Sequence, residues 1–266
     1  MSAATDPPPM TPLPRIAAPP PEVFAREYVA RSRPVILRGA LDDWPAMTRW
    51  SYDYFRRRFG EREVTAVRAR DGAMYDPQSG LNYETIRLAD YVDLLESGRP
   101  VDLYLVLRVH EAMPELFDDV VRPPYCRDVK WFRSKFFLGG YGTKGLLHRD
   151  LPENLYAQIF GRKRFVLLDR RETRRVHRHS LLSGVPNFSP VDVEAPDYAR
   201  YPRFRGAPLW VADLEPGDLL YIPRLWWHSA HGLSHGASVN QWWVRGAMLP
   251  VVRAAEAVMR WRDLRL

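Results

Sequence analysis

GLLHRDLPENLYAQIFGRKRFVLLD, at residues 145–169, and EPGDLLYIPRLWWHSAHGLSHGASVNQWW, at residues 215–243, are the two stretches that decide the predicted fold. Both contain short runs rich in β-branched and aromatic residues, which favour strands. Turn residues separate the runs. In EPGD, at residues 215–218, Pro at the second position and Gly at the third are typical of a type II turn. Many short strands spaced in this way predict a sandwich or barrel, with a jelly roll as the leading candidate.

The first half of the chain mixes helices with strands. Helical spacing of apolar residues is found at 22–32, 51–60 and 87–98, and strand-like runs lie at 34–40, 62–70 and 101–108. We expect this half to support the strands that follow, so the predicted fold class is mainly β with flanking helices.

The two ends of the chain differ from its centre. Residues 1–21 hold a cluster of prolines, which lack an amide donor and fix φ, and we predict a flexible arm that contributes little to the core. Residues 22–247 are expected to form one domain. Residues 248–266 are predicted to form a C-terminal helix, which could pack on the domain or on a second copy of the chain in a homodimer.

The composition limits the class of protein. The single cysteine, Cys126, excludes an intramolecular disulfide and a thiolate-rich zinc site. The N-terminus has neither the charged start nor the apolar centre of a secretory signal, and no apolar run reaches the roughly 20 residues of a bilayer span. We therefore expect a cytoplasmic protein with no membrane partner.

The chain is basic and rich in arginine. Its formal net charge is +7, and four of its 39 basic residues are lysines. The densest basic stretch lies between Arg170 and Arg178, in a predicted loop. Such a stretch can bind a nucleic acid, but it is more often a solvated face, which is the interpretation adopted here.

The tripeptide His148-Arg149-Asp150 is the central chemical signal. Side chains two residues apart on a strand share a face, so His148 and Asp150 can both point into a barrel while Arg149 points away. A third ligand has to come from elsewhere, and His228 follows the strand-like run at 218–223. Two His and one carboxylate leave three positions of an octahedral metal open, as iron(II) oxygenases require. The sequence therefore predicts a metal site of His148, Asp150 and His228.

The wider sequence supports this site. The two quoted stretches and the connector APDYARYPRF, at residues 195–204, resemble the cupin-like JmjC hydroxylases, such as the asparaginyl hydroxylase that inhibits hypoxia-inducible factor and the tRNA wybutosine hydroxylase. The resemblance covers residues 100–247 well and residues 22–100 loosely. It implies a double-stranded β-helix (jelly roll) and an oxidation that depends on Fe(II), 2-oxoglutarate and O₂.

The resemblance also assigns roles to single residues. It places the iron on His148, Asp150 and His228, with no catalytic residue beyond the metal centre. Lys163 matches the lysine that pairs with the distal carboxylate of 2-oxoglutarate, and a compact ammonium on a neighbouring strand suits that carboxylate. Tyr104 matches a tyrosine that donates to the same carboxylate. Without these roles, the two would be an ordinary strand-end lysine and a core aromatic.

Further polar residues match positions near the co-substrate and iron. Asn154 and Asn240 are two of them, although buried amides or turn residues would look the same. The sequence departs from the asparaginyl hydroxylase at Gly145, where that enzyme has a threonine that contacts 2-oxoglutarate. Thr143, two residues earlier on the same expected strand face, could replace this contact.

The implied function is that of a 2-oxoglutarate-dependent dioxygenase that hydroxylates a carbon centre, with an amino-acid side chain of a protein or peptide as the favoured substrate. A tRNA base or a small metabolite are alternatives. A non-catalytic metal-binding cupin is an alternative of another class, but it leaves Lys163 and Tyr104 without a purpose. Asp150 argues against a halogenase, and we interpret His231 and His235 as structural or rim residues, because chemistry needs open metal positions.

Overall fold

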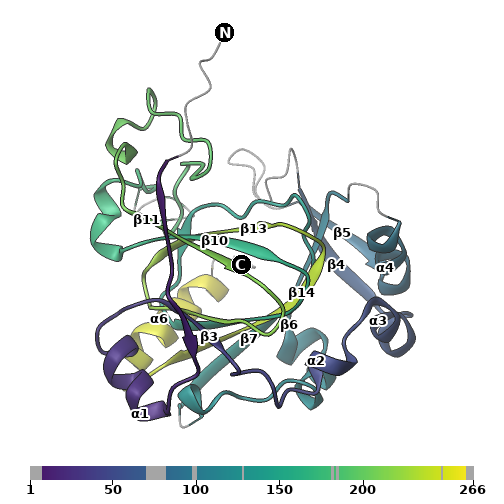
Figure 1. Cartoon of the computed structure of the whole chain (residues 1–266). Helices are drawn as coiled ribbons and strands as arrows, with labels where there is room; N and C mark the ends of the chain where they lie inside the picture. The colour runs from purple at the N-terminus through teal and green to yellow at the C-terminus, as the bar shows by residue number, and fades with distance from the viewer. Residues whose placement is uncertain are drawn as a thin grey trace.

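The computed structural model describes residues 8–69, 82–97, 101–127, 129–180, 183, 186–246 and 248–261, and two sheets dominate it (Figure 1). The smaller sheet has the order β1-β11-β10-β13-β8, with strands Met10–Pro12 (β1), Leu209–Leu214 (β11), Lys163–Leu168 (β10), Trp227–Gly232 (β13) and His148–Arg149 (β8). The larger sheet has the order β2-β3-β12-β9-β14-β7-β6-β4-β5, with strands Arg15–Ala17 (β2), Val35–Arg38 (β3), Leu219–Ile222 (β12), Glu153–Phe160 (β9), Gly236–Val244 (β14), Trp131–Gly139 (β7), Leu103–Arg108 (β6), Glu63–Arg68 (β4) and Asn82–Arg87 (β5).

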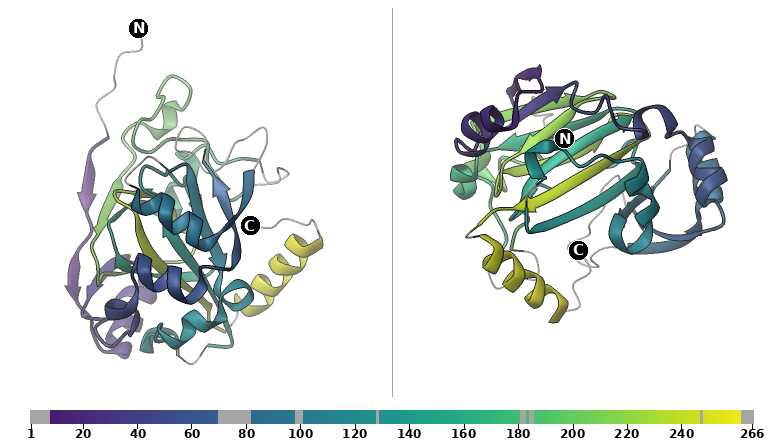
Figure 2. Two further views of the ribbon diagram at one scale, coloured as in Figure 1. Left: turned by 90° about the vertical axis from the view of Figure 1, so that its right-hand side faces the viewer. Right: turned by 90° about the horizontal axis from the view of Figure 1, so that it is seen from below.

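The helices flank these sheets. They are Pro21–Phe24 (α1), Ala46–Arg49 (α2), Tyr52–Phe59 (α3), Leu88–Glu96 (α4), Val109–Ala112 (α5) and Met248–Trp261 (α6). Shorter helical turns are the π-helical Ala25–Val29 (η1) and the 3₁₀ turns Pro114–Asp118 (η2), Pro124–Cys126 (η3), Arg170–Arg174 (η4) and Pro202–Phe204 (η5). Figure 2 shows the helices of the first half on the outer side of the larger sheet.

The two sheets enclose an apolar interior. Because side chains alternate along a strand, Tyr156 of β9 and Phe165 of β10 point into the interior and pack in one buried cluster. Their neighbours Leu155 and Val166 point the other way, Leu155 toward the helices and Val166 into a cluster with segments that follow β10. This arrangement agrees with the predicted jelly roll.

Most elements expected in the first half are present. The runs at 34–40, 62–70 and 101–108 form β3, β4 and β6, and the patterns at 51–60 and 87–98 form α3 and α4. The segment 22–32 differs from the expected single helix, because α1 ends at Phe24 and the π-helical turn η1 begins at Ala25. The EPGD turn is confirmed, since Gly217 has φ +90° and the Asp218 N–H donates to the Glu215 carbonyl over 3.1 Å.

The proline-rich segment contributes more to the fold than its composition predicts. Instead of a free arm, β1 pairs in parallel with β11, and β2 pairs in parallel with β3. Leu13, between the two strands, is buried in the interior cluster. Both strands lie at sheet edges, where a proline loses little because one side of the strand needs no hydrogen-bond donors.

The C-terminal helix packs on the domain through its first turns. Val252 of α6 is buried against Trp131 and Val244. Figure 2 shows that the rest of α6 extends away from the sheets, while its contact with a second copy of the chain stays a prediction. No helix of the described residues is long and apolar enough to cross a membrane.

The backbone at Gly140 passes so close to Gly232 that no side chain fits at position 232. A Cβ built on Gly232 of β13 would lie 1.6 Å from the Gly140 carbonyl oxygen, whereas one built on Gly142, with φ +74°, would meet nothing within 4 Å. We predict that Gly232→Ala lowers the free energy of unfolding by about 3 kcal/mol, because backbone cannot move aside as a side chain can. Gly142→Ala should cost only about 1 kcal/mol through its backbone conformation. Equal losses in urea denaturation of the two variants would contradict the steric explanation.

Candidate metal centre

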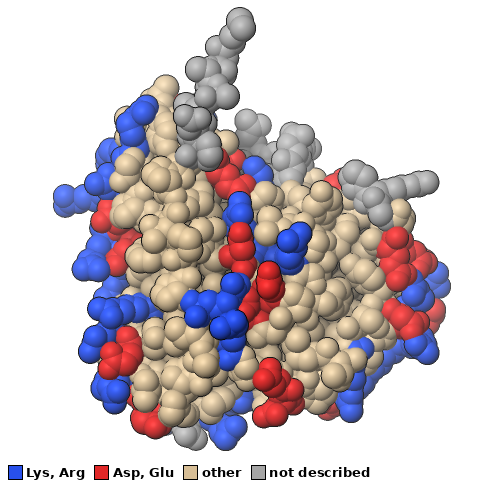
Figure 3. Space-filling model, in the orientation of Figure 1, with Lys and Arg blue, Asp and Glu red and all other residues tan. Residues whose placement is uncertain are grey.

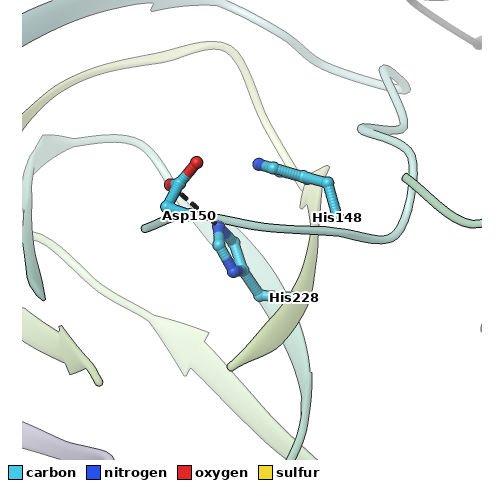
Figure 4. A group of neighbouring side chains, drawn as sticks. All are labelled: His148, Asp150 and His228. Carbon is cyan, nitrogen blue, oxygen red and sulfur yellow. Dashed lines mark ion pairs between the residues drawn. The ribbon is translucent and has the colours of Figure 1, made fainter. Parts of the chain in front are cut away.

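Strand pairing brings the two predicted histidine ligands together. β8 and β13 are antiparallel neighbours, and His148 lies directly opposite His228 in their register. Opposite residues of a pair project from the same face. The two rings are 4.3 Å apart between centroids, and Figure 4 shows both directed toward the Asp150 carboxylate.

Backbone carbonyls hold each histidine ring in a defined orientation. The Nδ1 atom of His148 lies 2.8 Å from the Leu146 carbonyl oxygen, and the Nδ1 atom of His228 lies 3.0 Å from the Trp226 carbonyl oxygen. A carbonyl only accepts, so Nδ1 carries the proton in each ring and Nε2 keeps a free lone pair. Burial, and then the nearby His148, lower the pKa of His228 to about 4, against the opposing effect of Asp150. His228 is therefore a neutral imidazole at neutral pH, as a metal ligand must be.

Asp150 completes the group. Its Oδ2 atom lies 3.6 Å from Nε2 of His228, and one ligand atom from each of the three residues lies within 4.8 Å of the others. The backbone of Asp150 is anchored, because its carbonyl accepts a 2.7 Å hydrogen bond from the Leu225 N–H. Leu225 has φ +63°, an uncommon conformation for a leucine that is found where function constrains the backbone. The donor set, two imidazoles and one carboxylate on one face, fits a divalent first-row metal such as iron(II).

A buried ammonium lies elsewhere in the same interior. Lys163, at the start of β10, is 5% exposed and donates 2.6 Å hydrogen bonds to the hydroxyls of both Tyr104 and Tyr156. The Tyr156 hydroxyl also lies 2.5 Å from Ser238 Oγ. Burial lowers the pKa of Lys163 to about 7. In the described part of the chain no carboxylate pairs with Lys163, so this site offers donors to an anion that the protein itself does not supply.

The two predicted asparagines differ in their bonding. Asn240 Oδ1 accepts a 2.8 Å hydrogen bond from the Lys135 N–H, which joins β14 to β7. Asn154 is 3% exposed, and its Oδ1 atom has no hydrogen-bond partner among the described residues. A buried acceptor without a donor is costly, and the role of Asn154 near the co-substrate stays a prediction.

Thr143 lies in a loop, so the expectation that it shares a strand face with Gly145 is wrong. The Gly140–Thr143 turn takes the chain off β7, and the Thr143 hydroxyl donates to the Gly140 carbonyl over 2.7 Å. Thr143 still lies close to Tyr104, because a Cβ built on Gly140 would lie 2.8 Å from the Tyr104 ring and 3.2 Å from the Thr143 hydroxyl. Its contact with a co-substrate stays a prediction.

The other two histidines of this region lie outside the triad. His231 is three residues after His228 on β13, so it points to the opposite face, where its Nδ1 atom lies 2.8 Å from Glu194. His235 accepts from the Tyr141 N–H over 3.3 Å.

Sequence patterns missed several residues of the site. Tyr156 and Ser238 surround Lys163, and Phe188 stacks on His148 with 5.4 Å between ring centroids. The position of Tyr156, two residues after Asn154 on one strand, was a signal that could have placed it on the interior face. Phe188 gave no such signal, since it belongs to the irregular segment after β10.

The basic stretch between Arg170 and Arg178 begins with η4. Two of its arginines form local ion pairs, Arg171 with Asp169 and Arg175 with Glu172. Figure 3 shows Lys and Arg interspersed with acidic residues along the edge of the molecule that carries this segment. The local pairs reduce the charge that this face offers to a nucleic acid.

Comparison with known proteins identifies the family. The sequence matches the cupin-like domain family over residues 20–247. The chain belongs to this family. Lysine-specific demethylase 8 of Xenopus tropicalis is 32% identical over 238 residues, which cover 88% of this chain and 53% of that protein. The chain thus spans about half the length of the demethylase relatives that it matches.

Two further relatives of this cupin-like protein are covered over more of their length. The bifunctional peptidase and (3S)-lysyl hydroxylase JMJD7 of Homo sapiens is 29% identical over 266 residues, covering 87% of this chain and 84% of that protein. The tRNA wybutosine-synthesizing protein 5 of Homo sapiens is 26% identical over 250 residues, covering 87% and 78%. These matches confirm the resemblance to the JmjC enzymes and the predicted fold class.

We predict that His148→Ala and His228→Ala each weaken binding of Fe(II) by more than about 100-fold, since each removes one of three ligands. The measurement is metal content after anaerobic dialysis, followed by titration with Mn(II). His231→Ala is the matched control, because it removes an imidazole from the same strand but from its other face. Full metal occupancy in either ligand variant would contradict the assignment.

Proposed function

We propose that the protein is an Fe(II)- and 2-oxoglutarate-dependent dioxygenase that hydroxylates a carbon centre, with an amino-acid side chain of a protein or peptide as its substrate. The family includes hydroxylases and demethylases by name. The observation that carries the proposal is Lys163, a buried ammonium with no counter-ion among the described residues, in the same interior as a two-histidine, one-carboxylate triad. A metal-binding cupin without catalysis has no use for this ammonium, and burying an unpaired cation is costly.

The residues around Lys163 are arranged to receive a carboxylate. Lys163 donates to the oxygens of Tyr104 and Tyr156, so Tyr104 keeps its own hydroxyl proton, which is directed to Tyr156 in the protein alone and would turn to reach a bound anion. One N–H of the ammonium and the Tyr104 O–H can then bind the distal carboxylate of 2-oxoglutarate. The charge-assisted bonds would fix the orientation of the co-substrate, and its other end would reach toward His148, Asp150 and His228.

The metal ligands leave space for chemistry. When bound there, iron(II) supplies the oxidation of 2-oxoglutarate by O₂ and the transfer of oxygen to carbon, with succinate and CO₂ as by-products. The protein holds three ligands on one side and leaves the remaining positions open. Phe188 covers one face of His148, which limits the access of water to that side. Asp150 occupies the position that a halogenase would leave for halide.

A peptide is favoured over a tRNA as the substrate. One relative is named for lysyl hydroxylation and another for tRNA wybutosine synthesis, so both classes occur in the family. The local ion pairs of Arg171 and Arg175 argue against the basic stretch as a dedicated RNA surface.

The proposal is tested by turnover of 2-oxoglutarate. We expect the Fe(II)-loaded protein to form succinate slowly even without a prime substrate, and Lys163→Met to bind 2-oxoglutarate about 10- to 100-fold more weakly while retaining metal. Succinate is measured by mass spectrometry and affinity by calorimetry with Mn(II). Lys130→Met, an exposed lysine outside the barrel, is the control. Unchanged 2-oxoglutarate affinity in Lys163→Met would make Lys163 a structural residue.

The pKa of Lys163 predicts a pH dependence. Burial lowers this pKa to about 7, so above neutral pH most of the free protein carries a neutral amine there. A dianion favours the protonated form, so its binding must take up a proton. Affinity for 2-oxoglutarate should therefore fall as pH rises above about 7, by up to about tenfold per pH unit. Calorimetry between pH 6 and pH 9 measures this, and Lys163→Arg should remove the dependence because its guanidinium stays charged.

A further inference from the structure

A second lysine, Lys135, faces the barrel interior. Lys135 lies two residues before Phe137 on β7, and Phe137 packs in the interior cluster, so the two share a face. The half-buried Lys135 places its ammonium 4.9 Å from the centre of the Trp242 ring. With the described residues this ammonium makes neither a hydrogen bond nor an ion pair.

Lys135 is close to the metal ligands. Trp242, beneath its ammonium, packs in the same cluster as Leu151, the residue after Asp150. Burial lowers the pKa of Lys135, and the Asp150 carboxylate opposes this shift. Lys135 also lies opposite Asn240 in the β7–β14 ladder. The position differs from that of Lys163, which lies with the two tyrosine hydroxyls.

The surroundings of Lys135 contain two more unsatisfied polar atoms. Trp242 and Asn154 are directly opposite in the β9–β14 ladder and thus share a face. The indole N–H of Trp242 and the Oδ1 atom of Asn154 are both buried, and neither has a hydrogen-bond partner in the part of the chain that the structure describes. A donor and an acceptor on one face match the carbonyl and N–H of a peptide unit.

We propose that Lys135, over the face of Trp242, selects a peptide substrate by pairing with an acidic side chain next to the residue that is oxidised. This inference rests on the proposed hydroxylase function and names the chemistry of its substrate. A carboxylate would supply the counter-ion that Lys135 lacks, and the partly dehydrated site strengthens the pair. The ring of Trp242 holds the ammonium in place, since a cation is attracted to an indole face.

The test measures binding separately from turnover. Three pools of fluorescein-labelled heptapeptides with a randomised central residue carry flanking Asp and Glu, Asn and Gln, or Lys and Arg. Anisotropy titrations use the protein with Mn(II) and 2-oxoglutarate without O₂, and the variants are Lys135→Met and Lys135→Glu. Lys130→Glu is the matched control, because it makes the same charge change at an exposed lysine.

We expect the wild type and Lys130→Glu to bind the acidic pool at least about tenfold more tightly than the amide pool. Lys135→Met should bind the acidic and amide pools equally well. Lys135→Glu should bind the basic pool more tightly than the acidic pool. Affinity for 2-oxoglutarate should change less than about twofold in Lys135→Met, which also shows that the variant is folded.

Three results would overturn the inference. The first is a wild type that binds no peptide pool or shows no preference for acidic peptides. The second is a large loss of 2-oxoglutarate affinity in Lys135→Met, which would assign the ammonium to the co-substrate. The third is Lys135-dependent binding of a single-stranded RNA oligonucleotide while acidic peptides bind weakly. Absence of succinate formation by the wild type would instead count against the proposed hydroxylase, whatever the binding data show.

Discussion

The pairing of β8 with β13 is the constraint on which the candidate site depends. β8 consists of His148 and Arg149 alone, so its own ladder is too short to define a register. Hydrogen bonds of neighbouring residues fix the register that this two-residue strand leaves undefined. The Gly145 N–H donates to the Ala230 carbonyl over 2.7 Å, and Ser229 Oγ donates to the Gly145 carbonyl over 2.6 Å. A slip by one residue would turn His148 out of the barrel, so these bonds hold the metal ligand as well as the strand.

The interior combines a stable apolar core with polar groups that reduce stability. Tyr156, Phe165 and Leu167 fill the space between the sheets. Among them lie Lys163 and His228, and burial lowers the pKa of both. A fold selected for stability alone would place apolar residues at these positions. Such polar groups in an apolar interior are candidates for binding ions and ligands.

Much of the fold followed from local patterns in the sequence. The β-branched and aromatic runs and the turn chemistry of residues 145–169 and 215–243 correctly indicated strands β9, β10, β12 and β14. The HxD spacing placed His148 and Asp150 together because both belong to one short segment. Lys163 and Tyr104 came from the resemblance to a family, and the structure brings them within 2.6 Å.

Other features depend on contacts that local patterns do not contain. The register of β7 against β14 brings the Lys135 ammonium over Trp242, and residues more than a hundred positions apart have no shared pattern. The edge strands β1 and β2 were missed because their prolines argued for a free arm, and only the sheet edge beside them makes those prolines acceptable. Thr143 was placed on a strand although the Gly139-Gly140 pair before it is a turn signal, and the turn that follows takes it off β7.

Lysine occupies two positions that face the interior of the barrel. The chain has 39 basic residues, of which four are lysines, and two of these four, Lys135 and Lys163, face the interior. A compact ammonium fits a confined space and can lose its proton, whereas a guanidinium is larger and stays charged. The two lysines have different environments. Lys163 donates to two tyrosine hydroxyls deep in the barrel, while the Lys135 ammonium lies over an indole and makes no hydrogen bond to the described residues.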